Sequence, residues 1–504
     1  MVQGKTRESY KTLALGRGVI YRKQDQQPEF EDFYLPFGGK LRSDNRWVVL
    51  TKLVPWKEIE DQYAKNFADS GMGAPAKAAR MALGALIIQT KLGLTDEETV
   101  AQIQENPYLQ YFLGYESYRD EKSFDSSMMV YFRKRLNLKE LSEINELIHG
   151  QYRKKSGNSK DKDNEDQGGS AGGSGNQGKL IVDASCAPAD IRYPTDLSLL
   201  GEAREKSEHI IDRLHEPLRG KEKKVRTYRK KARRDYLRAA KRRKLSAKEL
   251  KKAIGKQLQY LNRDLKHIHD LAGISSLGRL KRKEYRDLLV ISELYRQQNQ
   301  MYEQGVRRIA GRIVSISQPH VRPIVRGKAS APVEFGAKLS VSLVGGYAFV
   351  DRLSWENYNE SGDLIGQIET YKQRFGVYPE SVHADQIYRN RENRGYCKSK
   401  GIRLSGPRLG RPKKETDRQE KKLTRQDELD RNAIEGKLGQ GKRRFALDCI
   451  RAKLPVTSGS MIALTFLVMS LEKLLKGVFL RFFKTWSFVT TPPIRLCFST
   501  IRGR

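Results

Sequence analysis

The chain has 504 residues and a formal net charge of +36, with 96 Lys and Arg against 60 Asp and Glu. An excess of this size favours DNA, RNA or an anionic membrane as the partner, and the length allows roughly two to four domains. Four cysteines without Cys-x-x-Cys spacing argue against a disulfide scaffold and a structural zinc site, and are typical of a reduced cytoplasmic or nucleoid setting.

The N-terminal part predicts a helical domain that follows a polar arm. Residues 1–45 are expected to form an extended arm, and their first ten residues lack the apolar core of a signal peptide. Over residues 46–155 apolar residues recur at helical spacing, and Thr95 with Glu98 fits a capping box. Several short helices with a basic last one, over 123–136, indicate a helix-turn-helix-type DNA-binding domain. Its candidate DNA contacts are Arg133, Lys134 and Arg135; the alternative is a helical scaffold with a solvated basic end.

A flexible linker and a basic helical insertion are predicted next. Residues 156–178 are rich in Gly, Ser, Asn and Asp, which is typical of a linker. The strand LIVDAS follows, and residues 200–329 then carry long helical patterns, of which 277–302 could return antiparallel to the first helix. Within residues 221–256, 18 of 36 residues are Lys or Arg, so we expect contact with a nucleic-acid backbone rather than only a solvated helix face. The candidates are Arg229, Lys230, Arg233, Arg234, Lys241, Arg242 and Arg243.

The remaining segments predict a mixed α/β sheet once the insertion is set aside. Strand patterns at 335–343 and 348–353 flank a Gly-Gly hairpin turn, and a helix, the strand SVHAD, a helix, the strand IRLSG and a last helix follow. The predicted core comprises residues 179–199 and 330–475, with a tail over 476–504. The most apolar stretch, 461–471, is about half the length of a membrane-spanning helix, so a buried helix is the better interpretation.

Three carboxylates stand out in this basic chain. Asp183 and Asp385 each end a short apolar run, and Glu435 lies in a charged helical segment. Active sites usually lie at the carboxyl ends of parallel strands. If the two strands are neighbours, both aspartates can hold the same pair of divalent ions, which prefer oxygen ligands and act on phosphate esters. Asp190 and Asp196 are expected to be loop or cap residues, with the alternative that either of them is a metal ligand. His383 is expected to be a packing residue or to contact a metal ligand, and Cys186 to be a small buried residue.

Four passages resemble the insertion-sequence DDE transposases of the superfamily named after insertion sequence five. They are the helical block from MALGALIIQTKLGL to MMVYFRKRL, the passage VDASCAPADIRYPTDLSLL, the passage HADQIYRNRENRGYCKSKGIRLSGPRLGRP, and RNAIEGKLGQGKRRFAL. The last meets an Arg-x3-Glu-x6-Lys signature with Arg431, Glu435 and Lys442. One position departs from the family, because Glu428 stands where the signature has a tyrosine that could contact a DNA end.

The resemblance implies an α/β RNase H-like core with a long basic helical insertion and an all-α helix-turn-helix-type N-terminal domain. It implies catalytic metal ligands at Asp183, Asp385 and Glu435, two Mg²⁺ ions with Mn²⁺ as a substitute, and a homodimer or larger assembly on transposon ends and target DNA. A bacterial, nucleoid-associated cytoplasmic location is expected. Further candidate DNA contacts are Arg431, Lys442, Arg443, Arg408 and Arg411.

Two questions stay open at this level. Gly436, Gly439 and Gly441 weaken the helix of Glu435 by roughly 1 kcal/mol each, so that helix is either held by packing or ends near Gly439. The function also has two alternatives: a metal-dependent nuclease with the same core, and a non-catalytic DNA-binding protein descended from a transposase.

Overall fold

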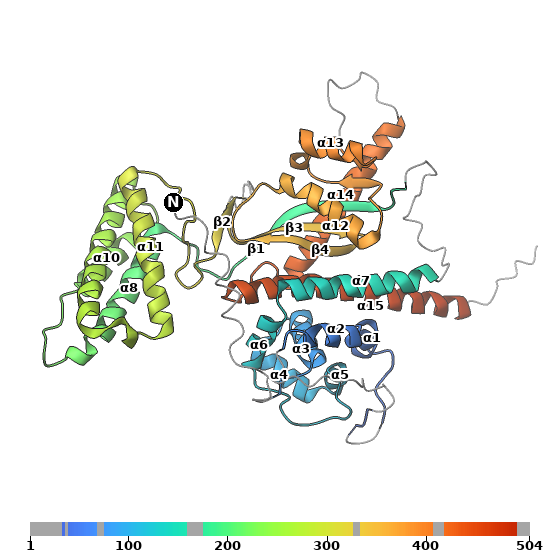
Figure 1. Cartoon of the computed structure of the whole chain (residues 1–504), viewed down its shortest axis with the longest axis horizontal. Coiled ribbons are helices and arrows are strands. Elements are labelled where there is room, and N and C mark those ends of the chain that lie inside the picture. The colour runs from blue at the N-terminus through green and yellow to red at the C-terminus, as the bar shows by residue number, and fades with distance from the viewer. Residues whose placement is uncertain are drawn as a thin grey trace, which may run out of the picture.

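The computed structural model describes residues 33–35, 39–67, 75–158, 175–325, 333–406 and 418–490. Figure 1 shows a sheet with its helices, a block of short helices on the far side of two long helices, and a helical bundle set apart from both. The mixed α/β core with helical regions is therefore confirmed. The six strands are β1 (Lys179–Pro188), β2 (Arg322–Val325), β3 (Val333–Val344), β4 (Tyr347–Ser354), β5 (Ser381–His383) and β6 (Arg403–Leu404).

The sheet combines an antiparallel half with a parallel half. Its order is β2-β3-β1-β5-β6, and β4 also pairs with β3. β1 is antiparallel to β3 and parallel to β5, while β5 is parallel to β6. Strand β1 is buried on both faces over most of its length. A strand buried on both faces needs apolar residues in succession, and this explains the nearly continuous apolar run in its sequence. The long insertion lies between β1 and β3, so it leaves the sheet pairing of both strands intact.

The β3–β4 hairpin turns on two glycines, as the sequence predicted. Gly345 and Gly346 have φ values of +53° and +79°, in the left-handed region that glycine adopts without steric cost. Positive φ at both central residues is the requirement of the two-residue hairpin turn whose twist matches the strands. The turn is covered by Lys473, whose ammonium group donates to the carbonyl of Gly345.

The helices of the core follow the predicted order. The last two helices are longer than the segments in which the sequence predicted them. After β4 the chain forms η4 (Glu360–Asp363) and α12 (Leu364–Phe375), and after β5 it forms η5 (Gln386–Tyr388) and α13 (Arg391–Ser399). Helix α14 (Arg418–Arg444) packs against β1 and β5, and α15 (Pro455–Thr490) contacts β4. Helix α15 therefore crosses the predicted boundary between core and tail at residue 475.

The described part of the N-terminal block consists of six short helices and a longer seventh helix. Thr95 and Glu98 form the predicted capping box, in which the Glu98 amide donates to the Thr95 hydroxyl at 3.2 Å and the Thr95 amide donates to the Glu98 carboxylate at 2.9 Å. The helices are α1 (Arg46–Leu53), α2 (Trp56–Ala64), α3 (Ala79–Leu92), α4 (Asp96–Glu105), α5 (Pro107–Phe112), α6 (Met128–Arg135) and α7 (Leu138–Asn158). The structure gives the helices that were expected here, while a helix-turn-helix role stays a prediction.

Helix α15 joins the N-terminal block to the sheet. It contacts α1, α3, α6 and α7 as well as β4, and Figure 1 shows α7 and α15 lying between the sheet and the short helices. Buried side chains of α15 such as Phe466 and Leu467 belong to one hydrophobic cluster that includes Leu86 of α3 and Val341 of β3. The apolar stretch at 461–471 is thus a buried helix, and among the described helices none combines the length and hydrophobicity that crossing a bilayer requires.

The insertion forms a helical bundle with its own core. Helices α8, α10 and α11 pack side by side, so the predicted helix over 277–302 does return along its neighbour (Figure 1). Two clusters, one containing Leu200 and Leu261 and one containing Ile211 and Leu271, fill its interior separately from the sheet core. The elements are α8 (Asp196–His215), η2 (Glu216–Leu218), α9 (Arg229–Ala240), α10 (Ala247–Ser275), η3 (Leu277–Arg279) and α11 (Arg282–Gln304).

The bundle contains a buried carboxylate that makes the stability of the chain depend on pH. Asp264 of α10 is 0% exposed, and neither carboxylate oxygen has a hydrogen-bond partner among the described residues. Burial, reinforced by the charge of Glu208, raises its pKa from 3.8 to about 7. As pH rises, the unfolded chain therefore releases this proton before the folded chain does, and the contribution of Asp264 becomes increasingly destabilising between about pH 4 and pH 7.

Asp264→Asn should therefore raise the free energy of unfolding by about 1 to 3 kcal/mol at pH 8, since the amide carries no charge to bury. At pH 4 the same substitution should change this free energy little. Urea unfolding at both pH values measures the difference. Asp270→Asn is the matched control, because Asp270 lies on the same helix and is exposed. An equal effect of Asp264→Asn at both pH values would contradict the prediction.

Candidate active site

Asp183 and Asp385 come from neighbouring parallel strands. Ile181 of β1 pairs with His383 of β5, so the two aspartates, each two residues further on, lie at matching levels of the sheet. Adjacent strands are about 4.8 Å apart, which brings the two positions to one edge of the sheet. Asp385 follows the end of β5 and directly precedes η5. The condition set by the sequence, that the two strands be neighbours, is met.

Side-chain alternation directs both aspartates toward α14. On β1 the Lys179 ammonium group lies 2.8 Å from Asp430 of α14, and Asp183, four residues later, lies on the same face of the strand. On β5 the buried ring of His383 lies 3.5 Å from Asp427 of α14, and Asp385 follows it by two residues. Because α14 covers this face of the sheet, its own side chains can complete the group.

Ion pairs fix α14 on the sheet. Arg403 of β6 binds Asp427 through two contacts of 2.7 and 2.9 Å, and this carboxylate raises the pKa of the guanidinium. Burial would raise the pKa of Asp430, but the hydrogen bond and charge of Lys179 prevail and lower it. Strands β1 and β6 thus each hold one acid of α14. The sequence signal for these two ion pairs is the three-residue spacing of Asp427 and Asp430, which places both acids on one side of the helix.

Arg431 connects the second and third carboxylates. Its Nη1 donates to Asp385 Oδ1 at 2.6 Å and to Glu435 Oε1 at 3.3 Å. The Asp385 and Glu435 side chains are 55% and 57% exposed, so the pair lies at an accessible edge of the sheet. The arrangement brings two of the three predicted carboxylates onto one cationic nitrogen.

These residues fit a divalent cation in their donor chemistry. All three candidate ligands are carboxylates, the oxygen donors that Mg²⁺ and Mn²⁺ take, and Arg431 Nη1 shows that a positive centre can sit between two of them. Across the described part of the chain, no three Asp, Glu, His or Cys side chains are already close enough together to hold one ion. Binding of one ion by all three carboxylates therefore requires movement of their side chains.

Helix α14 continues through Gly436, Gly439 and Gly441, the three glycines that prevented a prediction of its length from the sequence. It continues to Arg444, held by Ile434 and Leu438, which are 1% and 6% exposed against the core. Gly441 has a packing reason, because a Cβ there would lie 3.2 Å from Leu447 and 3.3 Å from Met469 of α15. A Cβ at Gly436 would meet nothing within 4 Å. Packing thus compensates for the weak helix propensity and keeps Glu435 on regular helix.

Replacing Gly436 by alanine should raise the free energy of unfolding by about 0.5 to 1 kcal/mol, since alanine favours the helix and meets open space. Gly441→Ala, the matched change five residues along the same helix, should be neutral or destabilising because Leu447 and Met469 would have to move. Chemical denaturation of both variants measures the contrast. Equal stabilisation by both would contradict the packing role of Gly441.

Residues near the carboxylates have structural roles. His383 is fully buried, its Nε2 lies 3.0 Å from the Ser381 hydroxyl, and burial lowers its pKa. Asp196 accepts hydrogen bonds from Gln298 and Arg312 and so links α8 to α11, and Asp190 is an exposed loop residue. Burial, together with the charge of Asp183, raises the pKa of the Tyr388 hydroxyl.

The three candidate cations of α6 have different surroundings. Arg133 is 8% exposed and binds Asp96 through contacts of 2.9 and 2.6 Å, so it ties α6 to α4. The guanidinium of Arg135 lies over the ring of Phe67 at 5.2 Å. Lys134 is exposed and lies over the ring of Tyr131 at 5.5 Å. Lys134 is therefore the residue of the three that is best placed to meet a phosphate.

The candidate cations of the insertion also divide into two groups. Arg229 is held by Asp212 in two contacts of 3.0 and 2.8 Å, and Arg242 pairs with Glu249 at 2.6 Å. The other five are exposed, and the structure gives none of them an ion pair with another described residue: Lys230, Arg233, Arg234, Lys241 and Arg243. We call these five the basic surface of the insertion.

The C-terminal end of α14 carries Lys442, which is half-buried, and Arg443, which is exposed. Both lie beyond Glu435 on the same helix, as the signature spacing requires. Glu428, at the position of the family tyrosine, is exposed. The candidates Arg408 and Arg411 lie outside the described residues.

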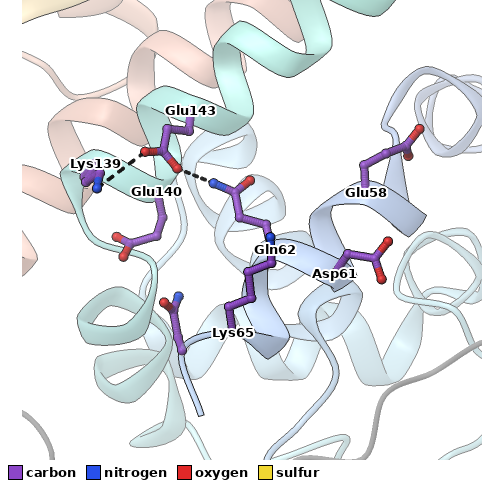
Figure 2. Close-up of a pocket in the computed structure, with 8 residues that line it drawn as sticks. Glu58, Asp61, Gln62, Lys65, Lys139, Glu140 and Glu143 are labelled. Atoms are coloured by element: carbon purple, nitrogen blue, oxygen red, sulfur yellow. Dashed lines mark hydrogen bonds and ion pairs between the residues drawn. The ribbon is translucent and has the colours of Figure 1, made fainter.

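A large pocket lies away from the carboxylates, between α2 and α7. Its volume is about 470 Å³, and Figure 2 shows acidic and basic side chains around its rim. Gln62 donates to Glu143, and Lys139 lies 3.8 Å from the same carboxylate. The lining residues are Glu58, Asp61, Gln62, Lys65, Asn66, Lys139, Glu140 and Glu143. Side chains of both charges line it, and the Gln62–Glu143 hydrogen bond crosses it from α2 to α7, so it has the character of a polar groove between helices.

Comparisons with known proteins connect this geometry with a family. Residues 382–472 match a model described as a transposase DDE domain, which includes Asp385 and Glu435. Residues 36–135 match a model described as a transposase domain (DUF772), which covers α1 to α6. No solved structure matches the chain.

One curated relative is the uncharacterized protein ORF8 in the nfe locus of Rhizobium meliloti. It is 33% identical over 97 residues, which is 19% of this chain and 46% of the relative, so the chain spans about half the length of the curated relative it matches. One transposase domain model matches the helical block, and the other matches the segment from the end of β5 through α14 into α15. The resemblance drawn from the sequence is thereby confirmed, and the chain is similar to the insertion-sequence DDE transposases over both domains.

Proposed function

We propose that the chain is a DNA transposase that binds the terminal repeats of its element, cleaves the DNA at the ends and joins the freed 3′-hydroxyl to target DNA. The observations that carry the proposal are the matching levels of Asp183 and Asp385 on paired parallel strands and the contact of Arg431 Nη1 with both Asp385 and Glu435 of α14. The transposase DDE domain matched over β5 to α15 supports it.

The strand order supports an RNase H-like catalytic core. Strands β4, β3 and β1 are antiparallel neighbours, and β5 and β6 continue the sheet parallel to β1. In such a sheet the reactive groups gather where the parallel strands end. Asp385 follows the end of β5, and Asp183 lies within β1, two residues beyond the last residue that pairs with β5. The proposed domains are the helical block (46–155), the core (179–199 and 330–475) and the insertion (200–329).

Asp183, Asp385 and Glu435 would hold the divalent ions, since the DDE domains of transposases use such ions. When bound, two Mg²⁺ ions activate the attacking oxygen and stabilise the leaving oxygen of a phosphodiester. The chain itself orients the DNA: Arg431 and Lys442 flank Glu435 on α14 and would bind the neighbouring phosphates. Water is the nucleophile for cleavage, and the 3′-hydroxyl that cleavage leaves is the nucleophile for joining.

Two surfaces would hold the DNA outside the core. The basic surface of the insertion projects five exposed cations from a bundle that has its own hydrophobic core. Lys134 and the exposed side of α6 would contribute from the helical block. Because two ends of an element must be joined together, we expect a homodimer or a larger assembly on the DNA.

Strand transfer distinguishes this proposal from a nuclease with the same core. The full chain is supplied with pre-cleaved DNA ends that carry a free 3′-hydroxyl, together with target DNA and Mg²⁺. A transposase produces covalently joined product, which a denaturing gel resolves. Cleavage of intact ends without any joined product would support the nuclease, and binding without either reaction would support the non-catalytic regulator.

A further inference from the structure

One guanidinium nitrogen lies between the two exposed carboxylates of the candidate active site. Arg431 Nη1 contacts Asp385 Oδ1 and Glu435 Oε1, which come from different elements 50 residues apart in the chain. Two carboxylates that share a site repel each other unless a positive charge lies between them. In this structure Arg431 supplies that charge and draws Asp385 and Glu435 together.

The guanidinium of Arg431 can bind a further acceptor besides the two carboxylates. Both contacts to the described carboxylates use Nη1, so the side of the guanidinium that carries Nη2 and Nε can meet another acceptor. The side chain is 33% exposed, at the edge of the sheet. A guanidinium presents several donors in a planar fork that suits a phosphate, so it can begin to bind DNA before it leaves the carboxylates.

We propose that Arg431 fills the cation position between Asp385 and Glu435 until DNA and divalent ions arrive, and then transfers to a DNA phosphate. This inference rests on the proposed function. The reason for transfer is electrostatic, because a guanidinium and a divalent ion cannot share two carboxylates without strong repulsion. By linkage, the phosphate that draws Arg431 away makes ion binding more favourable, and the ions make phosphate binding more favourable. Arg431 thus couples loading of the site to the presence of DNA.

The first test measures Mn²⁺ binding to the full chain without DNA, by calorimetry. Arg431→Ala and Arg431→Gln should each bind Mn²⁺ about three- to tenfold more tightly than the unsubstituted chain, because the competing cation is gone. Arg425→Ala is the matched control, since it removes the same charge from an exposed position of the same helix and should leave the affinity unchanged. Equal or weaker Mn²⁺ binding by both Arg431 variants overturns the proposal.

A second measurement separates this inference from the proposed function. Asp385→Asn should weaken Mn²⁺ binding; if it does not, the ions bind elsewhere and the proposed function itself fails. With Ca²⁺ as a non-cleaving ion, a duplex ending at the element's terminus should tighten ion binding to the unsubstituted chain. The Arg431→Ala variant should show a smaller gain. A gain of the same size in both chains overturns the coupling role of Arg431 while leaving Asp385 as a ligand.

Discussion

Asp183→Ala and Asp385→Ala should each lower the rate of DNA strand cleavage by at least about a hundredfold while the chain stays folded. Each change removes an oxygen donor from the face of the sheet that α14 covers. The strand register makes the two positions equivalent, so the two losses should be similar in size. Cleavage of a labelled duplex that carries the element's terminus, in Mg²⁺, measures the rate, and circular dichroism checks the fold.

Asp190→Ala provides the matched control for these changes. Asp190 follows the same strand, but it is exposed in the loop after β1 and its backbone amide bonds to Ile450. Its substitution should leave the cleavage rate within a few-fold of the original. A folded Asp183→Ala or Asp385→Ala variant that still cleaves at the original rate would exclude the metal-ligand role of that residue.

Neutralising the basic surface of the insertion should weaken DNA binding by about a hundredfold at moderate salt. Replacing Lys230, Arg233, Arg234, Lys241 and Arg243 by glutamine removes five exposed cations without touching the hydrophobic clusters of the bundle. Each phosphate contact contributes about 0.9 to the slope of log affinity against log salt, so the slope should fall by up to about 4.5. Fluorescence anisotropy over a salt series measures both quantities.

Arg229→Gln tests whether ion pairing removes a cation from this surface. Arg229 is held by Asp212, so its substitution should lower the thermal unfolding temperature and leave the salt slope nearly unchanged. If the five-residue variant keeps the full salt slope, the DNA does not contact the basic surface. If Arg229→Gln alone lowers the slope by about 1, its pair with Asp212 opens on binding.

Much of the catalytic half could be predicted because its signals are local. The Gly345–Gly346 turn requires positive φ at both positions, and the chain offers the two residues that adopt it at no cost. The apolar runs before Asp183 and Asp385 are buried strands, and their parallel pairing follows from the helices between them. The capping box at Thr95 likewise depends on residues three positions apart.

The roles of individual cations could not be predicted, because they depend on partners far away in the chain. In the sequence Arg133 is one of three basic residues at a helix end. In the structure it is buried and binds Asp96, which lies 37 residues earlier in the chain. Arg403 and Lys179 hold α14 through acids that local patterns cannot connect to them. The continuity of α14 through its glycines depends on the fit of Gly441 against Met469, which only the packed structure shows.

The position of α15 has a consequence for how the chain is made. A ribosome synthesises the helical block first and α15 after every other described element, yet α15 supplies buried side chains that both the block and the sheet require. Until residues 455–475 emerge, apolar faces of α3, α7 and β4 remain without their partner. The two halves should therefore acquire their final packing together and late.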